Sequence, residues 1–80
     1  MIKPEQLRAA RALLGLSQAD VATAAGVSVP TVKRLESGKG PAVTAEARGR
    51  LAAALEAAGV IFQPENGEGA GVRLRKSRPG

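Results

Sequence analysis

The chain has 80 residues and a formal net charge of +5 at pH 7, from 12 Lys and Arg against 7 Asp and Glu. This length predicts one domain without a separate ligand-sensing unit, and the positive charge favours an anionic partner such as nucleic acid. The sequence contains no Cys and no His, which excludes disulfides, thiolate metal sites and imidazole catalysis. We therefore expect no bound metal, no cofactor and no enzymatic activity.

The first predicted helix covers about Glu5 to Leu14. Pro4 and Glu5 suit a first turn, because an amide donor is not needed there and an acidic side chain meets the positive end of the helix dipole. Charges interrupt the apolar pattern of this segment, so it lacks the core of a signal peptide. No window of the chain approaches the roughly 18 apolar residues that cross a bilayer. We expect a cytoplasmic, nucleoid-associated protein that does not contact a membrane.

Two short helices meeting at a tight turn are predicted next. Ser17 can cap the first of them, with Asp20 in its first turn, and Gly26 ends it because glycine adopts a left-handed backbone at little cost. Ser28 can cap the second helix, which Gly38 ends. A glycine turn this short forces the two helices to cross steeply, so the segment has the helix-turn-helix arrangement.

The outward face of the second of these helices has the side chains of a DNA-binding surface. Outside the expected apolar stripe of Val32 and Leu35, it combines cations, a hydroxyl and methyl groups. In a major groove, Arg binds guanine by two hydrogen bonds and apolar groups contact the thymine methyl. The alternative is a solvated helix face with ordinary Lys and Arg residues. The outward residues are Val29, Pro30, Thr31, Lys33 and Arg34.

The segment from about Leu7 to Leu55 resembles the XRE family, the small helix-turn-helix proteins related to phage Cro and repressor domains. The residues that carry the resemblance are Gly15, Leu16, Ser17, Gln18, Ala22, Gly26, Val27, Ser28, Val32, Leu35, Glu36, Ser37 and Gly38. The resemblance implies a λ-repressor-like fold and DNA binding. It also implies an ion pair between Arg11 and Glu36, for which the alternative is two independent surface charges.

The resemblance assigns base contacts to the amino end of the second helix of the helix-turn-helix arrangement. Family members contact bases from the positions that match Val29, Pro30 and Arg34, and we expect Ser28 and Thr31 to assist Arg34. Phosphates are expected to meet Ser17 and Gln18, because amides at a helix start bind anions. The remaining expected phosphate contacts are Lys33, Ser37 and Lys39.

A fourth helix is predicted from about Ala45 to Ala58, with Thr44 as its cap. The chain then departs from the family, because two strands, 60–62 and 72–75, replace the usual fifth helix. The predicted fold is mainly α: four helices, forming a helix-turn-helix domain over 1–59, and a β-hairpin over 60–75. A basic flexible tail, 76–80, either stays solvated or adds phosphate contacts.

An isolated hairpin is marginally stable in water, so it must pack on the helices or pair with another sheet. We expect the hairpin to pair with the hairpin of a second copy and so form a homodimer interface. The alternative is a hairpin that only caps its own core. The side chains expected at that interface are Val60, Phe62, Val72 and Leu74.

Together these features predict a sequence-specific double-stranded DNA-binding regulator, most simply a repressor that binds an inverted-repeat operator as a homodimer. A first alternative is an antitoxin-like or accessory DNA-binding subunit whose hairpin docks a partner protein. A second is a helix-turn-helix adaptor that binds only proteins, which would have no salt-dependent affinity for DNA.

Overall fold

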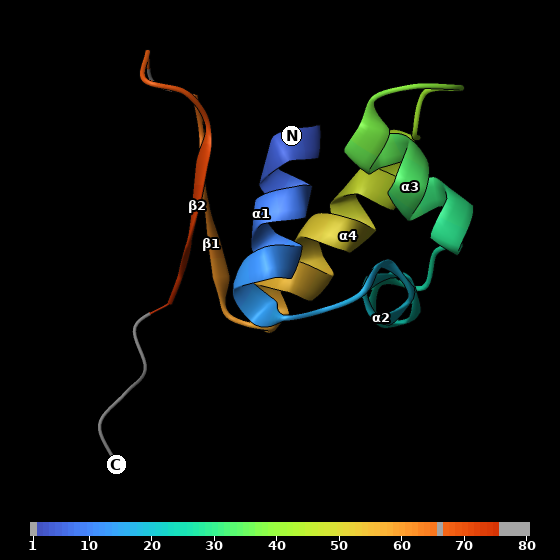
Figure 1. Cartoon of the computed structure of the whole chain (residues 1–80), viewed down its shortest axis with the longest axis horizontal. Coiled ribbons are helices and arrows are strands. Elements are labelled where there is room, and N and C mark those ends of the chain that lie inside the picture. The colour runs from blue at the N-terminus through green and yellow to red at the C-terminus, as the bar shows by residue number, and fades with distance from the viewer. Residues whose placement is uncertain (1, 66, 76–80) are drawn as a thin grey trace.

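Four helices precede a two-stranded antiparallel hairpin in the computed structural model, which describes residues 2–65 and 67–75 (Figure 1). The elements are α1 (Pro4–Leu14), α2 (Gln18–Ala25), α3 (Val29–Ser37), α4 (Ala45–Ala57), β1 (Val60–Gln63) and β2 (Gly71–Leu74). The predicted mainly α fold with a hairpin after the fourth helix is confirmed. Each boundary lies within one residue of its predicted place.

Local hydrogen bonds explain where the helices begin. Ser17 Oγ accepts from the Asp20 amide at 3.0 Å, and Asp20 Oδ2 accepts from the Ser17 amide at 3.0 Å. Ser28 and Thr44 accept from the amide three residues later in the same way. These side chains satisfy amides that have no partner within the helix, so the polar residues at these positions fix the helix starts.

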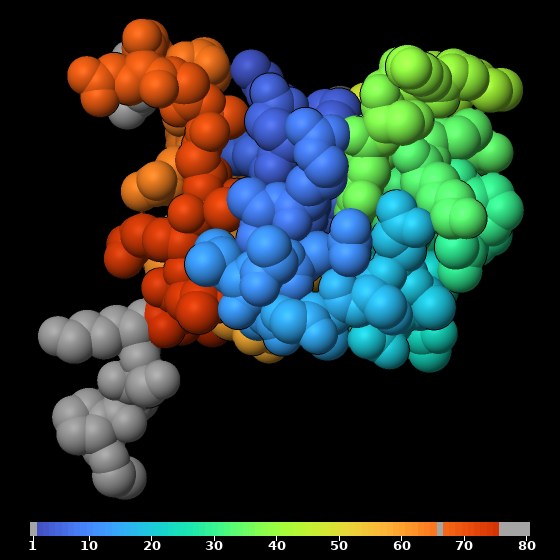
Figure 2. Space-filling model, in the orientation of Figure 1, coloured from blue at the N-terminus to red at the C-terminus, as the bar shows by residue number. Residues whose placement is uncertain are grey.

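The helices form a small core in which α1, α3 and α4 contribute the largest buried side chains. Leu7, Leu35, Leu51 and Leu55 are at most 2% exposed. α2 packs on α3 and α4, and α1 packs on α3. In Figure 1 the hairpin lies beside α1 at one end of the molecule, and α2 and α3 lie at the other end. The space-filling view shows the same order along the surface (Figure 2).

The hairpin packs on the helices of its own chain, with β2 against α1 and β1 against α4. Its register pairs Val60 with Leu74 and Phe62 with Val72. Phe62 and Val72 are half-buried against the core, whereas Leu74 is 44% exposed. Val60 is completely buried in this core, so the expectation that its side chain lies at a dimer interface is wrong. The reason is that Val60 lies three residues after the end of α4, where its side chain enters the core formed by the helices.

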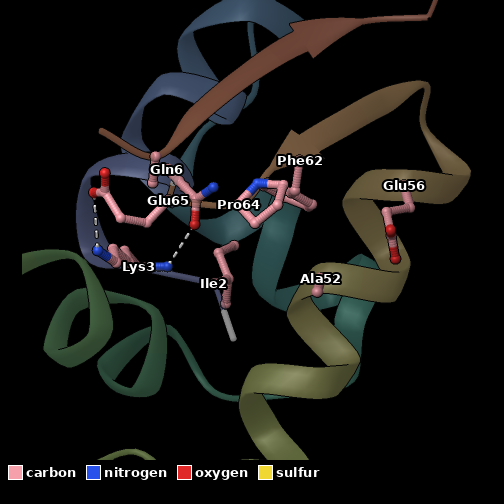
Figure 3. Close-up of a pocket in the computed structure, with 9 residues that line it drawn as sticks. Ile2, Lys3, Gln6, Ala52, Glu56, Phe62, Pro64 and Glu65 are labelled. Atoms are coloured by element: carbon pink, nitrogen blue, oxygen red, sulfur yellow. Dashed lines mark hydrogen bonds and ion pairs between the residues drawn. The ribbon is translucent and has the colours of Figure 1, made fainter. Parts of the chain in front are cut away.

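Gln6 joins the start of α1 to the hairpin. Its Nε2 donates to the carbonyl oxygens of Gln63 and Gly71, each at 3.0 Å, and its Oε1 accepts from the Lys3 amide at 2.9 Å. Figure 3 shows Gln6 beside a hollow of about 370 Å³, lined also by Ile2 and Phe62. Every polar atom of this buried amide group therefore has a partner, and the hairpin is held to the helices by hydrogen bonds as well as apolar contacts.

Candidate nucleic-acid interface

The turn between α2 and α3 has the geometry that a helix-turn-helix unit requires. Gly26 ends α2 with φ 69° and ψ 34°, in the left-handed region. The Val27 amide then donates to the Ala22 carbonyl at 3.0 Å, which closes the helix end. Ser28, two residues after Gly26, caps α3. The chain therefore reverses within a few residues, and α3 crosses α2 at the surface of the molecule (Figure 1).

One stripe of α3 faces the core. Val32 and Leu35 are buried, as predicted from their spacing. Val29 is half-buried against the same core, so the prediction that it lies outside the buried set is wrong. The reason is helical geometry, since Val29 precedes Val32 by three residues and therefore shares its side of the helix. Only part of the Val29 side chain is left for a partner.

A polar row follows the outer face of α3 at intervals of three residues. Ser28 Oγ lies 2.8 Å from Thr31 Oγ1, and Arg34 Nη2 donates to Thr31 Oγ1 at 3.5 Å. Pro30 and Lys33 are exposed beside this row. The structure therefore brings four predicted base-contacting residues and one predicted phosphate-contacting residue onto one surface of α3, with Ser28 and Thr31 already connected to each other.

Arg34 is half-buried, and its side chain lies along the loop after α3. A side-chain carbon at Gly40 would lie 3.6 Å from Arg34 Cδ, so the arginine stem covers this glycine. Arg34 Nε is shielded from solvent and has no hydrogen-bond partner among the described residues. This position does not satisfy all the donors of the guanidinium group.

The predicted phosphate-contacting residues divide into two groups. Lys33 and Lys39 are exposed at α3 and the loop after it. Ser17 and Ser37 are also exposed, but their hydroxyl oxygens accept from the Asp20 and Lys39 amides. Ser37 Oγ also donates to the Arg34 carbonyl at 3.3 Å, so Ser37 acts as part of the end of α3.

Gln18 points toward the interior side of the unit. Its Nε2 donates to Glu36 Oε1 at 3.0 Å. Glu36 also accepts from Arg11, through Nε at 2.6 Å and Nη2 at 3.0 Å, and Arg11 Nη1 donates to the Leu16 carbonyl at 3.0 Å. Arg11 and Glu36, the two residues expected to pair, thus form a two-bond ion pair that joins α1 and α3, and the Gln18 hydrogen bond adds α2 to it. For Gln18, one amide hydrogen remains for a phosphate.

The surroundings of two carboxyl groups change their pKa values. Burial alone would raise the pKa of Glu36, but hydrogen bonds from Arg11 and Gln18 and the charges of Arg11 and Arg8 lower it overall. The hydrogen bonds between Asp20 and Ser17 lower the pKa of Asp20, the backbone bond most. Both groups are therefore carboxylates at neutral pH and keep their hydrogen bonds to the helices.

Three arginines that were not predicted as site residues lie next to this unit. Arg8 Nη1 donates to the Glu36 carbonyl at the end of α3. Arg48 borders a hollow beside Arg34 and Lys39, and Arg50 Nη1 would lie 3.4 Å from a side-chain carbon at Gly26. Because these arginines lie on two different helices, their spacing in the sequence does not show that they lie near the helix-turn-helix unit. For Arg8, its place three residues before Arg11 on one face of α1 was an available signal.

The positively charged side chains around α3 form a surface suited to a polyanion. We call Lys33, Arg34, Lys39 and Arg48 the cationic rim, because Lys33 is exposed on α3 and the other three border one hollow. None of the helices within residues 2–65 and 67–75 has the length and apolar character needed to cross a bilayer. The predicted basic tail, Lys76 to Gly80, lies outside the described residues.

Comparison with known families agrees with this geometry. A family model described as a helix-turn-helix domain matches residues 5–60, which is more than half of the chain. The match begins at the second residue of α1, includes α2, α3 and α4, and stops at the first residue of β1. No curated protein matches the chain significantly. The chain belongs to the helix-turn-helix domain family of the Cro and C1 type, the XRE-like group, and its helix-turn-helix unit is a DNA-binding element.

Proposed function

We propose that this protein is a sequence-specific regulator of transcription that represses by occupying a promoter. The observation that carries the proposal is the outer surface of α3, where the exposed Ser28 and the half-buried Thr31 and Arg34 form one row of polar side chains. Their hydroxyl and guanidinium groups match the hydrogen-bonding edges of bases in a major groove. The protein would act in the cytoplasm, on the DNA of the nucleoid.

The amino ends of α2 and α3 supply the phosphate contacts that place α3 in the groove. Ser17 Oγ accepts from Asp20, so its own hydrogen is left to donate to a phosphate oxygen. Gln18 retains one amide hydrogen for the same purpose. Lys33 and Lys39 lie on the flanks of α3 and bind phosphate by charge, which adds affinity without selecting a sequence.

Arg34 is the main base-contacting residue in this mechanism. In the free protein its Nε is shielded and has no partner among residues 2–65 and 67–75, and an unpaired buried donor costs about 1–3 kcal/mol. Turning the side chain away from Gly40 removes this cost, and the guanidinium then reaches a guanine with two hydrogen bonds. Pro30 and the exposed part of Val29 contact thymine methyl groups. The hydroxyl groups of Ser28 and Thr31 can hydrogen-bond to donor or acceptor groups on the base edges.

We propose further that two copies bind together to an inverted repeat. A single α3 contacts only a few base pairs, so one copy selects a short sequence that occurs often in a genome. Two copies related by a two-fold axis double the length of the recognised sequence and give the operator the same symmetry.

Selection of bound sequences from random duplexes tests this function. The purified chain is expected to enrich one inverted-repeat sequence. A matched variant, Thr31→Ala with Arg34→Ala, keeps the Ser28 cap of α3 and the rest of the cationic rim and is expected to enrich none. If the unchanged protein enriches nothing beyond this double variant, or has no salt-dependent affinity for any duplex, the proposal is wrong.

A further inference from the structure

The outer edge of β2 has backbone groups without a partner in the described chain. The Arg75 amide donates to the Gly59 carbonyl, and the register is Ile61 with Arg73 and Gln63 with Gly71. In an antiparallel pair, hydrogen-bonded and non-hydrogen-bonded positions alternate. Gly59, Ile61 and Gln63 are therefore the bonded positions of β1. It follows that the amides and carbonyls of Val72 and Leu74 point away from β1.

α1 covers a face of the hairpin and leaves this edge open. Gln6 Nε2 reaches the carbonyls of Gln63 and Gly71, which belong to one bonded pair and point between the two strands. A single donor can reach both only from a face of the sheet. Val72 and Leu74 thus lie on a strand edge that α1 does not occupy, with Leu74 44% exposed. An open edge of this kind is a template for another strand.

An exposed leucine of α1 lies near that edge. Leu13 is 45% exposed and follows Gln6 by seven residues, two helical turns, so it shares the hairpin-facing side of α1. Seven residues of helix rise about 10 Å, and the three residues from Gly71 to Leu74 in a strand also rise about 10 Å. α1 and β2 run in the same direction in Figure 1, and Gly71 is level with Gln6, so we infer that Leu74 lies level with Leu13. The open edge therefore carries two apolar side chains beside it.

We propose that β2 pairs antiparallel with β2 of a second copy, about a two-fold axis at Val72. The open positions are even-numbered, and only an axis at Val72 or Arg73 keeps three of the four residues of β2 paired within the strand. An axis at Arg73 places Arg73 opposite itself, and an axis at Leu74 places Arg73 opposite Arg75; like charges directly opposite are unfavourable. An axis at Val72 places Arg73 opposite Gly71 and Leu74 opposite Ala70.

The position of Gln63 supports this register independently. A side-chain carbon at Gly71 would lie 2.9 Å from Gln63 Oε1, so the Gln63 side chain leans across Gly71 toward the open edge. With the axis at Val72, one row of side chains across the extended sheet runs from Gln63 over Gly71 to Arg73 of the second copy. Gln63 Oε1 is then an acceptor for that guanidinium group, and the missing side chain of Gly71 leaves room for the contact.

The same arrangement suits the function proposed above, on which this inference rests. Adjacent antiparallel strands of one sheet are related by a two-fold axis perpendicular to the sheet. All four helices lie on one side of the hairpin in Figure 1, so both copies place their helices on the same side of the four-stranded sheet. Both α3 helices, the elements farthest from the hairpin, then point to the same side, as binding to one duplex requires.

Single-cysteine variants test the register directly, because the natural chain has no cysteine. With the axis at Val72, two residues at position 72 have Cα atoms about 5.5 Å apart, within the range of a disulfide. At positions 73 and 74 the two Cα atoms are separated by about 8 Å and more, which is too far. Val72→Cys is therefore expected to cross-link at least tenfold faster under mild oxidation than Arg73→Cys, Leu74→Cys or the exposed α4 control Ala53→Cys.

Faster cross-linking of Arg73→Cys or Leu74→Cys overturns the proposed axis, and equal slow rates at all four positions overturn strand pairing. Sedimentation equilibrium of Arg73→Ala gives a second measurement that does not depend on cysteine chemistry. Its dimer dissociation constant is expected to rise about tenfold, whereas Arg50→Ala on α4 leaves it unchanged. A monomeric natural chain, or no effect of Arg73→Ala, contradicts the proposal.

Titration of the same proteins with the selected duplex separates this inference from the proposed function. If two copies bind an inverted repeat without cross-linking at position 72, the strand pairing is wrong and the regulator function stands. If Val72→Cys cross-links but no duplex is bound, the pairing is correct and the function is wrong.

Discussion

Arg11 on α1 holds Glu36, near the end of α3, by two hydrogen bonds, with Arg11 Nε 2.6 Å from Glu36 Oε2. The Glu36 side chain is 7% exposed and the Arg11 side chain 26% exposed. Arg8 adds a hydrogen bond to the Glu36 carbonyl. Because the same helix binds the hairpin through Gln6, α1 connects the hairpin to the helix that we propose contacts bases.

Removing the Arg11 guanidinium is expected to destabilise the fold strongly. Arg11→Ala leaves the Glu36 carboxylate buried without its ionic partner, and breaking a buried pair in this way costs about 3 kcal/mol. Urea unfolding measures the loss. Arg50→Ala, which breaks the exposed pair with Glu46, is the matched control and should cost about 0.5 kcal/mol or less. Equal small losses in the two variants would mean that the Arg11 pair does not stabilise α3.

The contribution of Glu36 is expected to vanish in acid. Its pKa is lowered in the folded protein, so its charged form stabilises the fold at pH values above the ordinary value of 4.5. That stability is lost as the pH falls below 4.5 through the lowered pKa. The stability difference between the natural chain and Glu36→Gln should therefore be largest near neutral pH and shrink in acid.

Thermal unfolding of both proteins between pH 7 and pH 2 measures this difference, and the subtraction removes the contributions of other carboxyl groups. Glu46→Gln is the control, since its ion pair with Arg50 is exposed and contributes little at any pH. A difference for Glu36→Gln that does not change over this range would refute the assignment.

Replacing Gln6 should loosen the hairpin. Gln6→Leu removes the donor that reaches the Gln63 and Gly71 carbonyls and leaves the Lys3 amide without its acceptor. We expect a loss of about 1–3 kcal/mol in unfolding free energy. Hydrogen exchange of the hairpin amides should accelerate more than that of the α3 amides. The adjacent exposed variant Glu5→Leu loses only the helix-dipole contribution of about 0.3–1 kcal/mol and should leave hairpin exchange unchanged. Unchanged hairpin exchange in Gln6→Leu would exclude the proposed clamp.

Local chemistry made most of the fold predictable from the sequence. Ser17 with Asp20, Ser28, and Thr44 fix helix starts through hydrogen bonds to amides three residues away, and Gly26 ends α2 through its own backbone. These interactions depend on neighbours in the chain. The structure therefore agrees with the predicted elements to within one residue.

The directions of several site side chains depend on residues far away in the sequence, and these were not predictable. Gln18 turns to Glu36 on another helix, and the Arg34 stem lies against Gly40 in the following loop. Gln6 donates to a carbonyl 57 residues away. Val29 was the exception, because its spacing from Val32 already indicated the buried side of α3.

Lys33 is expected to contribute affinity without selectivity. Lys33→Ala removes one exposed cation from the cationic rim, so binding to selected and random duplexes should weaken by the same factor. The slope of log affinity against log salt concentration should fall in magnitude by about 0.9, the value for one phosphate contact. Fluorescence anisotropy at several salt concentrations measures both effects. A loss confined to the selected duplex would instead make Lys33 a base-contacting residue.

The central claim is that α3 recognises base sequence through Arg34, and the affinity of Arg34→Ala for two duplexes tests it most directly. One duplex carries the selected sequence and the other the same bases in scrambled order, with Lys33→Ala measured alongside. We predict that Arg34→Ala costs about 1–3 kcal/mol on the selected duplex, relaxes the preference at one base pair, and changes binding to the scrambled duplex much less. Equal losses of Arg34→Ala on both duplexes, as for Lys33→Ala, would contradict the account.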